Sequence, residues 1–204
     1  MQKIMFNDRY GLTDAVLDGR KTMTRRIIPK DIAETLIIEG DDIFPDIPCE
    51  GLMKYSRYKV GEEVAIAQKY WDLRNDAAFY EALAKADPSF PIECIKGEKG
   101  CNNKMFVKAS WMPHRIRITD IRVERLQDIS DEDCLREGVV ASNCKTYFNG
   151  YAYDWVCDQY GDILATQWFK TPREAFAGLI DKVSGKGTWE SNPYVWVYSF
   201  ELIK

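Results

Sequence analysis

The sequence contains a single histidine, His114, and its six cysteines form no C-x-x-C pair. Zinc sites draw on Cys and His ligands at short spacings, so this composition argues against zinc. A Ser-His-Asp triad would have to use His114, and no nucleophile-elbow motif accompanies that residue. We therefore expect neither a metal nor a cofactor, and we expect the irregularly spaced cysteines to be free thiols.

The chain also lacks any run of about 18 uncharged apolar residues, the length that a membrane-spanning helix needs. Its N-terminal segment MQKIMFNDRY does not have the charged-then-apolar order of a secretory signal. A net charge of -4 and a pI near 5.2 argue against attraction to nucleic acid over the whole surface. These absences predict a soluble, cytoplasmic protein without membrane contact, in which any phosphate contact is local.

The chain has enough apolar material for one sizeable core, with 46% hydrophobic and 13% aromatic content over 204 residues. This length favours a single domain, 1–204, over two independent domains. Two insertions interrupt it, at about 72–103 and 142–168, and the second is rich in tyrosine and tryptophan. The first insertion contains a predicted helix over 77–86.

Hydrophobic periodicity predicts the main elements of the fold. Residues 115–126 alternate polar and apolar side chains, and continuing this alternation through 119–122 requires a β-bulge. A capping box with proline at the first helical position starts a helix at Thr171, and a final strand covers 194–203. Further strands are expected at 3–6, 22–28, 63–70 and 104–109, and further helices at 12–17 and from Ser130 to Gly138. This order predicts an α+β fold built on a small, mostly antiparallel β-barrel.

The segment GRKTMTRR, residues 19–26, places Lys21 three residues ahead of Thr24 within a cluster of cations. A lysine beside a hydroxyl can serve as a base beside a nucleophile, whereas a cation cluster can bind an anion. Lys21 can act as a base only when it is largely neutral, and neighbouring arginines and partial burial lower a lysine pKa. The alternative is an ordinary exposed junction whose arginines pair with surface acids.

Strand geometry limits the catalytic interpretation. Residues three apart on a regular strand point to opposite faces, so Lys21 and Thr24 can meet only where the chain turns between them. A helix that ends at Gly19 allows such a turn. Without the turn the catalytic interpretation fails, while anion binding survives.

The same segment resembles the G-x-K-x-x-E-x-R signature of ASCH domains, relatives of the PUA RNA-binding fold, with threonine in place of glutamate. The resemblance extends to 122–138 and 185–193, as in larger phage and bacterial members, and leaves out both insertions. It implies a PUA-like barrel. Members that hydrolyse N(4)-acetylcytidine use a lysine, a threonine and a glutamate, which the resemblance places on Lys21, Thr24 and Glu137.

Glu137 falls in the last turn of its predicted helix, where a carboxylate faces the negative end of the helix dipole. A contact to Lys21 or Arg26 would compensate, and Glu137 would then orient the threonine or bind the substrate amine. An exposed glutamate at a helix end is the alternative.

The remaining candidates are ligand-binding residues. Arg20, Arg25 and Arg26 could hold a phosphate. Trp189 could stack on a base and Asn192 could read its edge, although a tryptophan in this glycine-rich loop can equally close a barrel end.

Three functions are consistent with these residues. The first is a module that binds RNA, DNA or a modified nucleoside in a basic cleft. The second is a metal-independent amidohydrolase that deacylates an acylated nucleobase. The third is a phage-associated structural or regulatory protein that binds a protein partner through the aromatic insertion.

Overall fold

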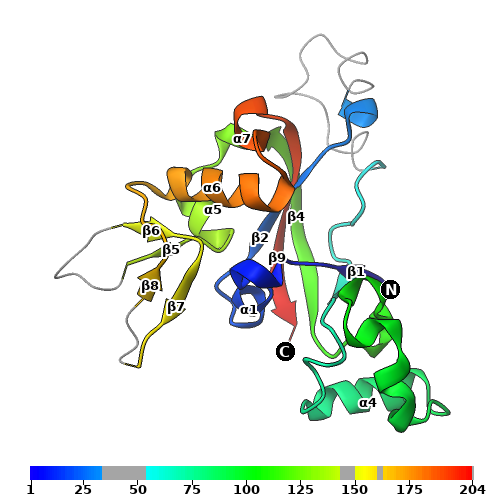
Figure 1. The fold of residues 1–204 in the computed structure, drawn as a ribbon. Coiled ribbons are helices and arrows are strands. Elements are labelled where there is room, and N and C mark those ends of the chain that lie inside the picture. Colours follow the sequence, from blue (N-terminus) through cyan, green and yellow to red (C-terminus); the bar gives the residue numbers. More distant parts are fainter. Residues whose placement is uncertain (34–53, 143–149, 160–162, 204) are drawn as a thin grey trace.

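The computed structural model describes residues 1–33, 54–142, 150–159 and 163–203. Its larger sheet has the strand order β1-β3-β4-β9-β2, in which β1 and β3 are parallel and the other neighbours are antiparallel. The strands are β1 (Gln2–Ile4), β2 (Met23–Ile27), β3 (Glu63–Ile66), β4 (Arg115–Arg125) and β9 (Tyr194–Ile203). The protein is therefore α+β with a mostly antiparallel sheet, as predicted (Figure 1).

Short helices and two small hairpins surround this sheet. Figure 1 shows α5, α6 and the hairpins on one side of the sheet, with α4 beyond the lower ends of β4 and β9. The helices are α1 (Leu12–Leu17), α4 (Ala77–Ala86), α5 (Asp131–Arg136), α6 (Pro172–Ser184) and α7 (Thr188–Ser191). The hairpins pair β5 (Val140–Ala141) with β6 (Tyr151–Ala152) and β7 (Trp155–Cys157) with β8 (Ile163–Ala165). Short 3-10 turns are η1 (Asp8–Tyr10), η2 (Ile92–Gly97), η3 (Lys99–Cys101), η4 (Lys104–Phe106), η5 (Ala109–Trp111) and η6 (Leu126–Asp128).

The long strand β4 contains the predicted bulge. Its pairing with β9 shifts register between Ile118 and Asp120. Ile116 and Ile118 are buried before the shift and Ile121 is buried after it. Without the bulge, strict alternation would place Ile121 on the opposite face from Ile116 and Ile118. The extra residue returns Ile121 to the core face.

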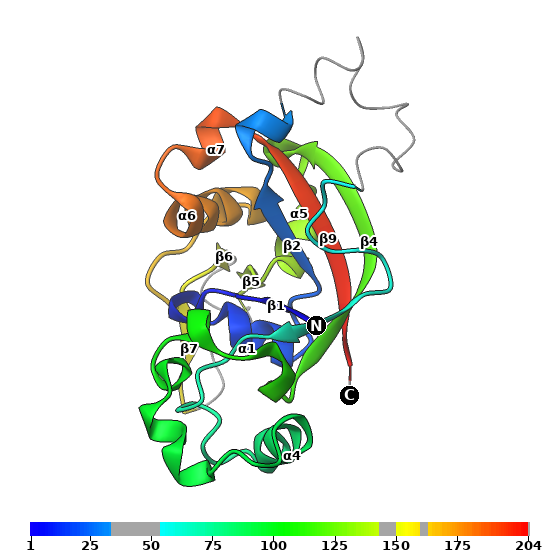
Figure 2. The same cartoon turned by 90° about the vertical axis from the view of Figure 1, so that its right-hand side faces the viewer.

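The predicted closed barrel is wrong for the chain that the structure describes. No ladder joins the edge strands β1 and β2 in these ranges. β1 ends at Ile4, and the chain leaves the sheet for the turn η1, so no strand backbone faces β2. Instead, the Arg26 Nη2 atom donates to the Met5 carbonyl across the gap at 2.7 Å. Figure 2 shows the resulting curved, open sheet with α1 and α6 beside it.

The predicted strand at 104–109 is also wrong, because this segment forms the turns η4 and η5. The Asn103 side chain accepts a hydrogen bond from the Met105 N–H at 2.9 Å. The Lys108 N–H donates to the Tyr70 hydroxyl at 2.8 Å. Side chains therefore take backbone donors that a strand would have used for a ladder.

The described residues form two apolar cores. The larger one packs the main sheet against α1, α5 and α6. The smaller one, which we call the insertion core, joins the end of β3 to α4 and η5 and consists of Ala65, Ala67, Tyr70, Leu73, Phe79, Leu83, Val107, Trp111 and Met112. The first insertion therefore packs on the sheet edge through its own set of side chains.

Candidate functional site

The chain turns before β2, as the catalytic interpretation requires. Gly19 has a left-handed φ of 75°, and the Lys21 N–H donates to the Ala15 carbonyl at 2.8 Å. The Thr22 N–H then donates to the Arg136 carbonyl at 3.0 Å, and β2 begins with the next residue. Lys21 consequently lies outside the regular strand, and its side chain lines the same pocket as Thr24.

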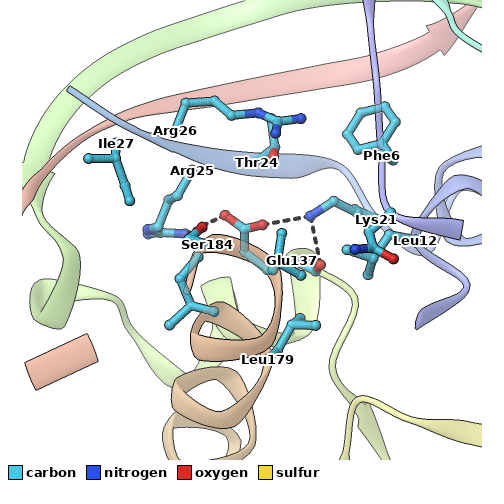
Figure 3. A pocket seen from close by; sticks show the side chains of 13 residues that line it. Phe6, Leu12, Lys21, Thr24, Arg25, Arg26, Ile27, Glu137, Leu179 and Ser184 are labelled. Carbon is cyan, nitrogen blue, oxygen red and sulfur yellow. Dashed lines mark hydrogen bonds and ion pairs between the residues drawn. The ribbon is translucent and has the colours of Figure 1, made fainter. Parts of the chain in front are cut away.

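This pocket, here called the lysine pocket, has a volume of about 360 Å³, within the usual range for small-molecule sites. It lies between β2, the segment after β1 and the C-terminal half of α6 (Figure 3). Its polar lining consists of Asn7, Lys21, Thr24, Arg25, Arg26, Glu137 and Ser184. Its apolar lining consists of Phe6, Leu12, Ile27, Leu179, Ile180 and Val183. The site is thus half ionic and half apolar.

A buried ion pair forms the floor of the lysine pocket. The Lys21 Nζ atom donates to the Glu137 carboxylate and to the Glu137 carbonyl, each at 2.6 Å. Lys21 is only 2% exposed and Glu137 only 4%. Since Glu137 is the C-cap of α5, the ammonium compensates both its carboxylate and the negative end of the helix.

Arg25, rather than Arg26, provides the second cation of Glu137. Its Nη1 atom donates to the other Glu137 oxygen at 3.1 Å. Its remaining donors bind Glu124, Asp133 and the Met23 sulfur. Burial lowers the pKa of Arg25, but the carboxylates of Glu137, Glu124 and Asp133 outweigh it and raise the pKa. Arg25 is therefore occupied by carboxylates and has no donor left for a phosphate.

The pKa of Lys21 is lowered from its ordinary value of 10.5. Burial is the largest cause, Glu137 acts in the opposite direction, and Arg26 and Arg25 add smaller lowering effects. The direction agrees with the expectation from the sequence, although burial outweighs the arginines. A lowered pKa makes the neutral amine accessible at a lower pH than in an exposed lysine.

Thr24 completes the group of three candidate catalytic residues. It is 4% exposed and lines the lysine pocket together with Lys21 and Glu137 (Figure 3). Among the residues that the structure describes, its hydroxyl makes no hydrogen bond. The hydroxyl is therefore available to a ligand in the lysine pocket.

The other candidates lie outside this pocket. Arg20 pairs with Asp18 at 3.1 Å and covers the Trp155 ring at 5.1 Å. The Asn192 Oδ1 atom accepts from the Gln127 N–H, and the Gln127 side chain donates to the Trp189 carbonyl, both at 2.8 Å. Trp189 and Asn192 thus attach α7 to η6, the turn that follows β4.

Sequence reasoning missed the apolar half of the lysine pocket. Phe6 follows the short strand β1, and Leu179 and Val183 come from α6. The periodicity of α6 marks these residues as apolar, but it does not show which of them face a pocket. That depends on how α6 packs against the open edge of the sheet.

No cysteine lines the lysine pocket in the part of the chain that the structure describes. Cys94, Cys101 and Cys134 are free thiols, and burial raises the pKa of Cys134 to about 12. Within the described ranges, no group of three or more His, Cys, Asp or Glu residues could hold a metal ion. No helix in the same ranges is both long enough and apolar enough to cross a membrane.

The fold and site define an α+β protein with a buried lysine–glutamate pair beside a threonine hydroxyl. Comparison with known proteins finds no matching family model, no similar curated protein and no similar solved structure. We therefore infer the function of this chain from the geometry of its site.

Proposed function

We propose that the chain is an ASCH-like, PUA-related hydrolase that removes the acyl group from an acylated nucleobase such as N(4)-acetylcytidine. Thr24 is the nucleophile, Lys21 is the general base and Glu137 orients the lysine. One observation carries the proposal: these residues come from three separate segments and line one pocket of small-molecule size. The same residues are the three that the resemblance selected.

In this structure the Lys21 amine donates to Glu137 and not to Thr24, so the proposed reaction begins when the amine turns from Glu137 toward the Thr24 hydroxyl. The neutral Lys21 amine takes the Thr24 hydroxyl proton while the oxygen attacks the acyl carbonyl. The intermediate collapses to an acyl-threonine ester, and the lysine returns the proton to the departing base amine. Water, deprotonated by Lys21, then attacks the ester carbonyl, and the lysine returns this proton to the Thr24 oxygen as the acid leaves. Arg26 lines the same pocket and supplies positive charge for the developing oxyanion.

The cations Lys21 and Arg25 already form ion pairs in the lysine pocket, and this favours hydrolysis over phosphate binding there. Lys21 and Arg25 are paired with carboxylates, so a phosphate there would have to displace Glu137. A neutral acyl amide needs no such displacement. The binding module therefore has less support at this pocket, and the partner-surface hypothesis for the second insertion stays a prediction.

Release of acetate from N(4)-acetylcytidine tests the proposal. Thr24→Val and Lys21→Met should each lower the rate by at least about 100-fold, because each removes a reacting group. Thr22→Val is the matched control, since the Thr22 hydroxyl accepts from Arg136 and does not line the pocket. Circular dichroism establishes that each variant folds.

The pH profile gives a second measurement. The wild-type rate should rise with pH through the pKa of Lys21, with the inflection below 10.5, because burial lowers that pKa. Failure of the wild type to release acetate would refute the proposed reaction. So would full activity of either active-site variant.

A further inference from the structure

A second pocket lies on the other side of the Arg26 side chain. It has a volume of about 380 Å³ and shares Arg26 and Ile27 with the lysine pocket. Both pockets occupy the gap between the unpaired edges β1 and β2, which the Arg26–Met5 hydrogen bond crosses. We call it the arginine pocket, because Arg57 joins Arg26 in its lining.

The arginine pocket contains positive charge without a matching negative charge. Neither Arg26 nor Arg57 forms an ion pair with a carboxylate in the described part of the chain, and no described acid lines the pocket. Arg25, on the same strand, binds three carboxylates. Among the described residues, the counter-charges therefore lie beside Arg25 and none lines the arginine pocket.

The phenols of Tyr58 and Tyr198 do not supply a negative charge to the arginine pocket. Burial raises the pKa of Tyr58 and of Tyr198, so both hydroxyls are neutral at pH 7. Burial lowers the pKa of Arg26, and the charge of Arg57 acts in the same direction, while Tyr58 and Glu137 oppose them. A bound anion would relieve the repulsion between the two guanidinium groups.

The wall around these charges is aromatic and held in place by hydrogen bonds. The Tyr58 and Tyr198 rings meet edge-on at 5.2 Å. The Tyr58 hydroxyl donates to the Lys3 carbonyl at 3.1 Å, and the Tyr198 hydroxyl lies 3.1 Å from the Ser56 hydroxyl. Arg57 itself is exposed and covers the Tyr58 ring at 5.4 Å, so its guanidinium can meet a ligand without moving the core.

We propose that the arginine pocket binds a phosphate monoester, so that the substrate is an acylated nucleotide rather than a free nucleoside. A ligand that extends past the Arg26 side chain would place its acyl amide beside Thr24 and its phosphate near Arg26 and Arg57. The identity of the base rests on the proposed function. Phosphate binding rests on the charges of the arginine pocket alone.

Calorimetric titration of the wild-type chain with cytidine 5′-monophosphate and with cytidine tests whether the arginine pocket binds the phosphate. The monophosphate should bind about tenfold more tightly than cytidine, or better, through charge-assisted hydrogen bonds. Arg57→Gln should reduce the monophosphate affinity to that of cytidine and leave cytidine binding unchanged, whereas Arg57→Lys should retain part of the difference. Arg9→Gln is the matched control, since Arg9 is likewise exposed and covers the Tyr10 ring at 5.6 Å.

Equal affinity for the monophosphate and cytidine, including no binding of either, would overturn the proposal. An unchanged monophosphate affinity in Arg57→Gln would do the same. Inorganic phosphate that binds as tightly as the monophosphate would show an anion site that does not recognise a nucleotide. Failure of the proposed hydrolysis is separate, because it would abolish acetate release without removing the affinity difference.

Discussion

The buried pair of Lys21 and Glu137 illustrates how position changes the value of an ion pair. Arg20 and Asp18 form a pair of similar length on the surface, where their side chains are 37% and 60% exposed. Water screens the surface pair, so it contributes little to stability. Loss of one partner from a buried pair instead leaves a charge in a medium that solvates it poorly.

Glu137→Gln should therefore lower the free energy of unfolding by about 3 kcal/mol. Asp18→Asn, which breaks the exposed pair, should lower it by less than about 1 kcal/mol. Urea denaturation at pH 7 measures both. The double variant Lys21→Met with Glu137→Gln should lose less than the sum of its single changes, because it leaves no unpaired lysine. Equal losses for Glu137→Gln and Asp18→Asn would contradict the expected effect of burial.

The lowered pKa of Lys21 predicts that the free energy of unfolding depends on pH. Since its pKa is lower in the folded than in the unfolded chain, the unfolded chain binds more protons between the folded pKa and 10.5. The contribution of Lys21 to stability should rise with pH through this window. The difference in unfolding free energy between wild type and Lys21→Met, followed from about pH 7 to about pH 10, isolates that contribution. A difference that falls with increasing pH would show the opposite shift.

Gly138 should tolerate no side chain. Its φ is 109°, and an added Cβ would lie 2.9 Å from a methyl group of Leu12 and 3.8 Å from the Lys21 side chain. Gly138→Ala should therefore lower the unfolding free energy by at least about 1 kcal/mol and reduce acetate release, because it displaces the adjacent Glu137. Gly97→Ala, where nothing lies within 4 Å of the added Cβ, is the control for both assays.

At the scale of elements, α6 connects a local sequence signal to the wall of the lysine pocket. The Thr171 side chain accepts from the Glu174 N–H, and the Glu174 side chain accepts from the Thr171 N–H, as the capping box predicts. The C-terminal half of this helix supplies Leu179, Ile180, Val183 and Ser184 to the pocket. The cap thus stabilises a helix whose other end lines the lysine pocket.

Thr171→Ala should lower the free energy of unfolding by about 1 kcal/mol, since it leaves an N–H at the helix start without its acceptor. Thr171→Ser keeps the hydroxyl and should lose much less. Denaturation compares the two, and acetate release should persist in both because the cap lies at the far end of α6 from the pocket. A loss in Thr171→Ser equal to that in Thr171→Ala would exclude the hydroxyl as the cause.

Across the whole molecule, the insertion core stands apart from the two pockets. Phe79 and Leu83 of α4 pack there with Tyr70 and Trp111, and none of these residues lines either pocket. The insertion therefore adds buried apolar surface to the sheet edge without contributing to the proposed site.

Phe79→Ala should lower the free energy of unfolding by about 3 to 5 kcal/mol through the cavity it leaves. The folded fraction should retain wild-type affinity for cytidine 5′-monophosphate, because the insertion core does not contact the arginine pocket. Denaturation and calorimetric titration measure the two effects. Weakened nucleotide binding in folded protein would show that the insertion supports the site after all.

Much of the fold could be predicted from the chain, because neighbouring residues set local backbone preferences. The helix at 77–86, the strand at 194–203 and the capping box at Thr171 all depend on residues close in sequence. The bulge in β4 could be predicted because the polar and apolar side chains of 115–126 cannot keep alternating through 119–122 without an extra residue. The turn at Gly19 was likewise readable, since it depends on one helix end.

The ionic site and the open sheet depended on contacts between distant residues. Lys21 and Glu137 are 116 positions apart, and only the packing of α5 against the start of β2 buries them together. The sheet stays open because β1 is too short to face β2. The hydrophobic pattern of each strand could not show this. Arg57 is a candidate phosphate ligand because it lines the pocket in the gap between β1 and β2. Local preference decides the elements, but burial and charge pairing at long range decide which side chains meet in a site.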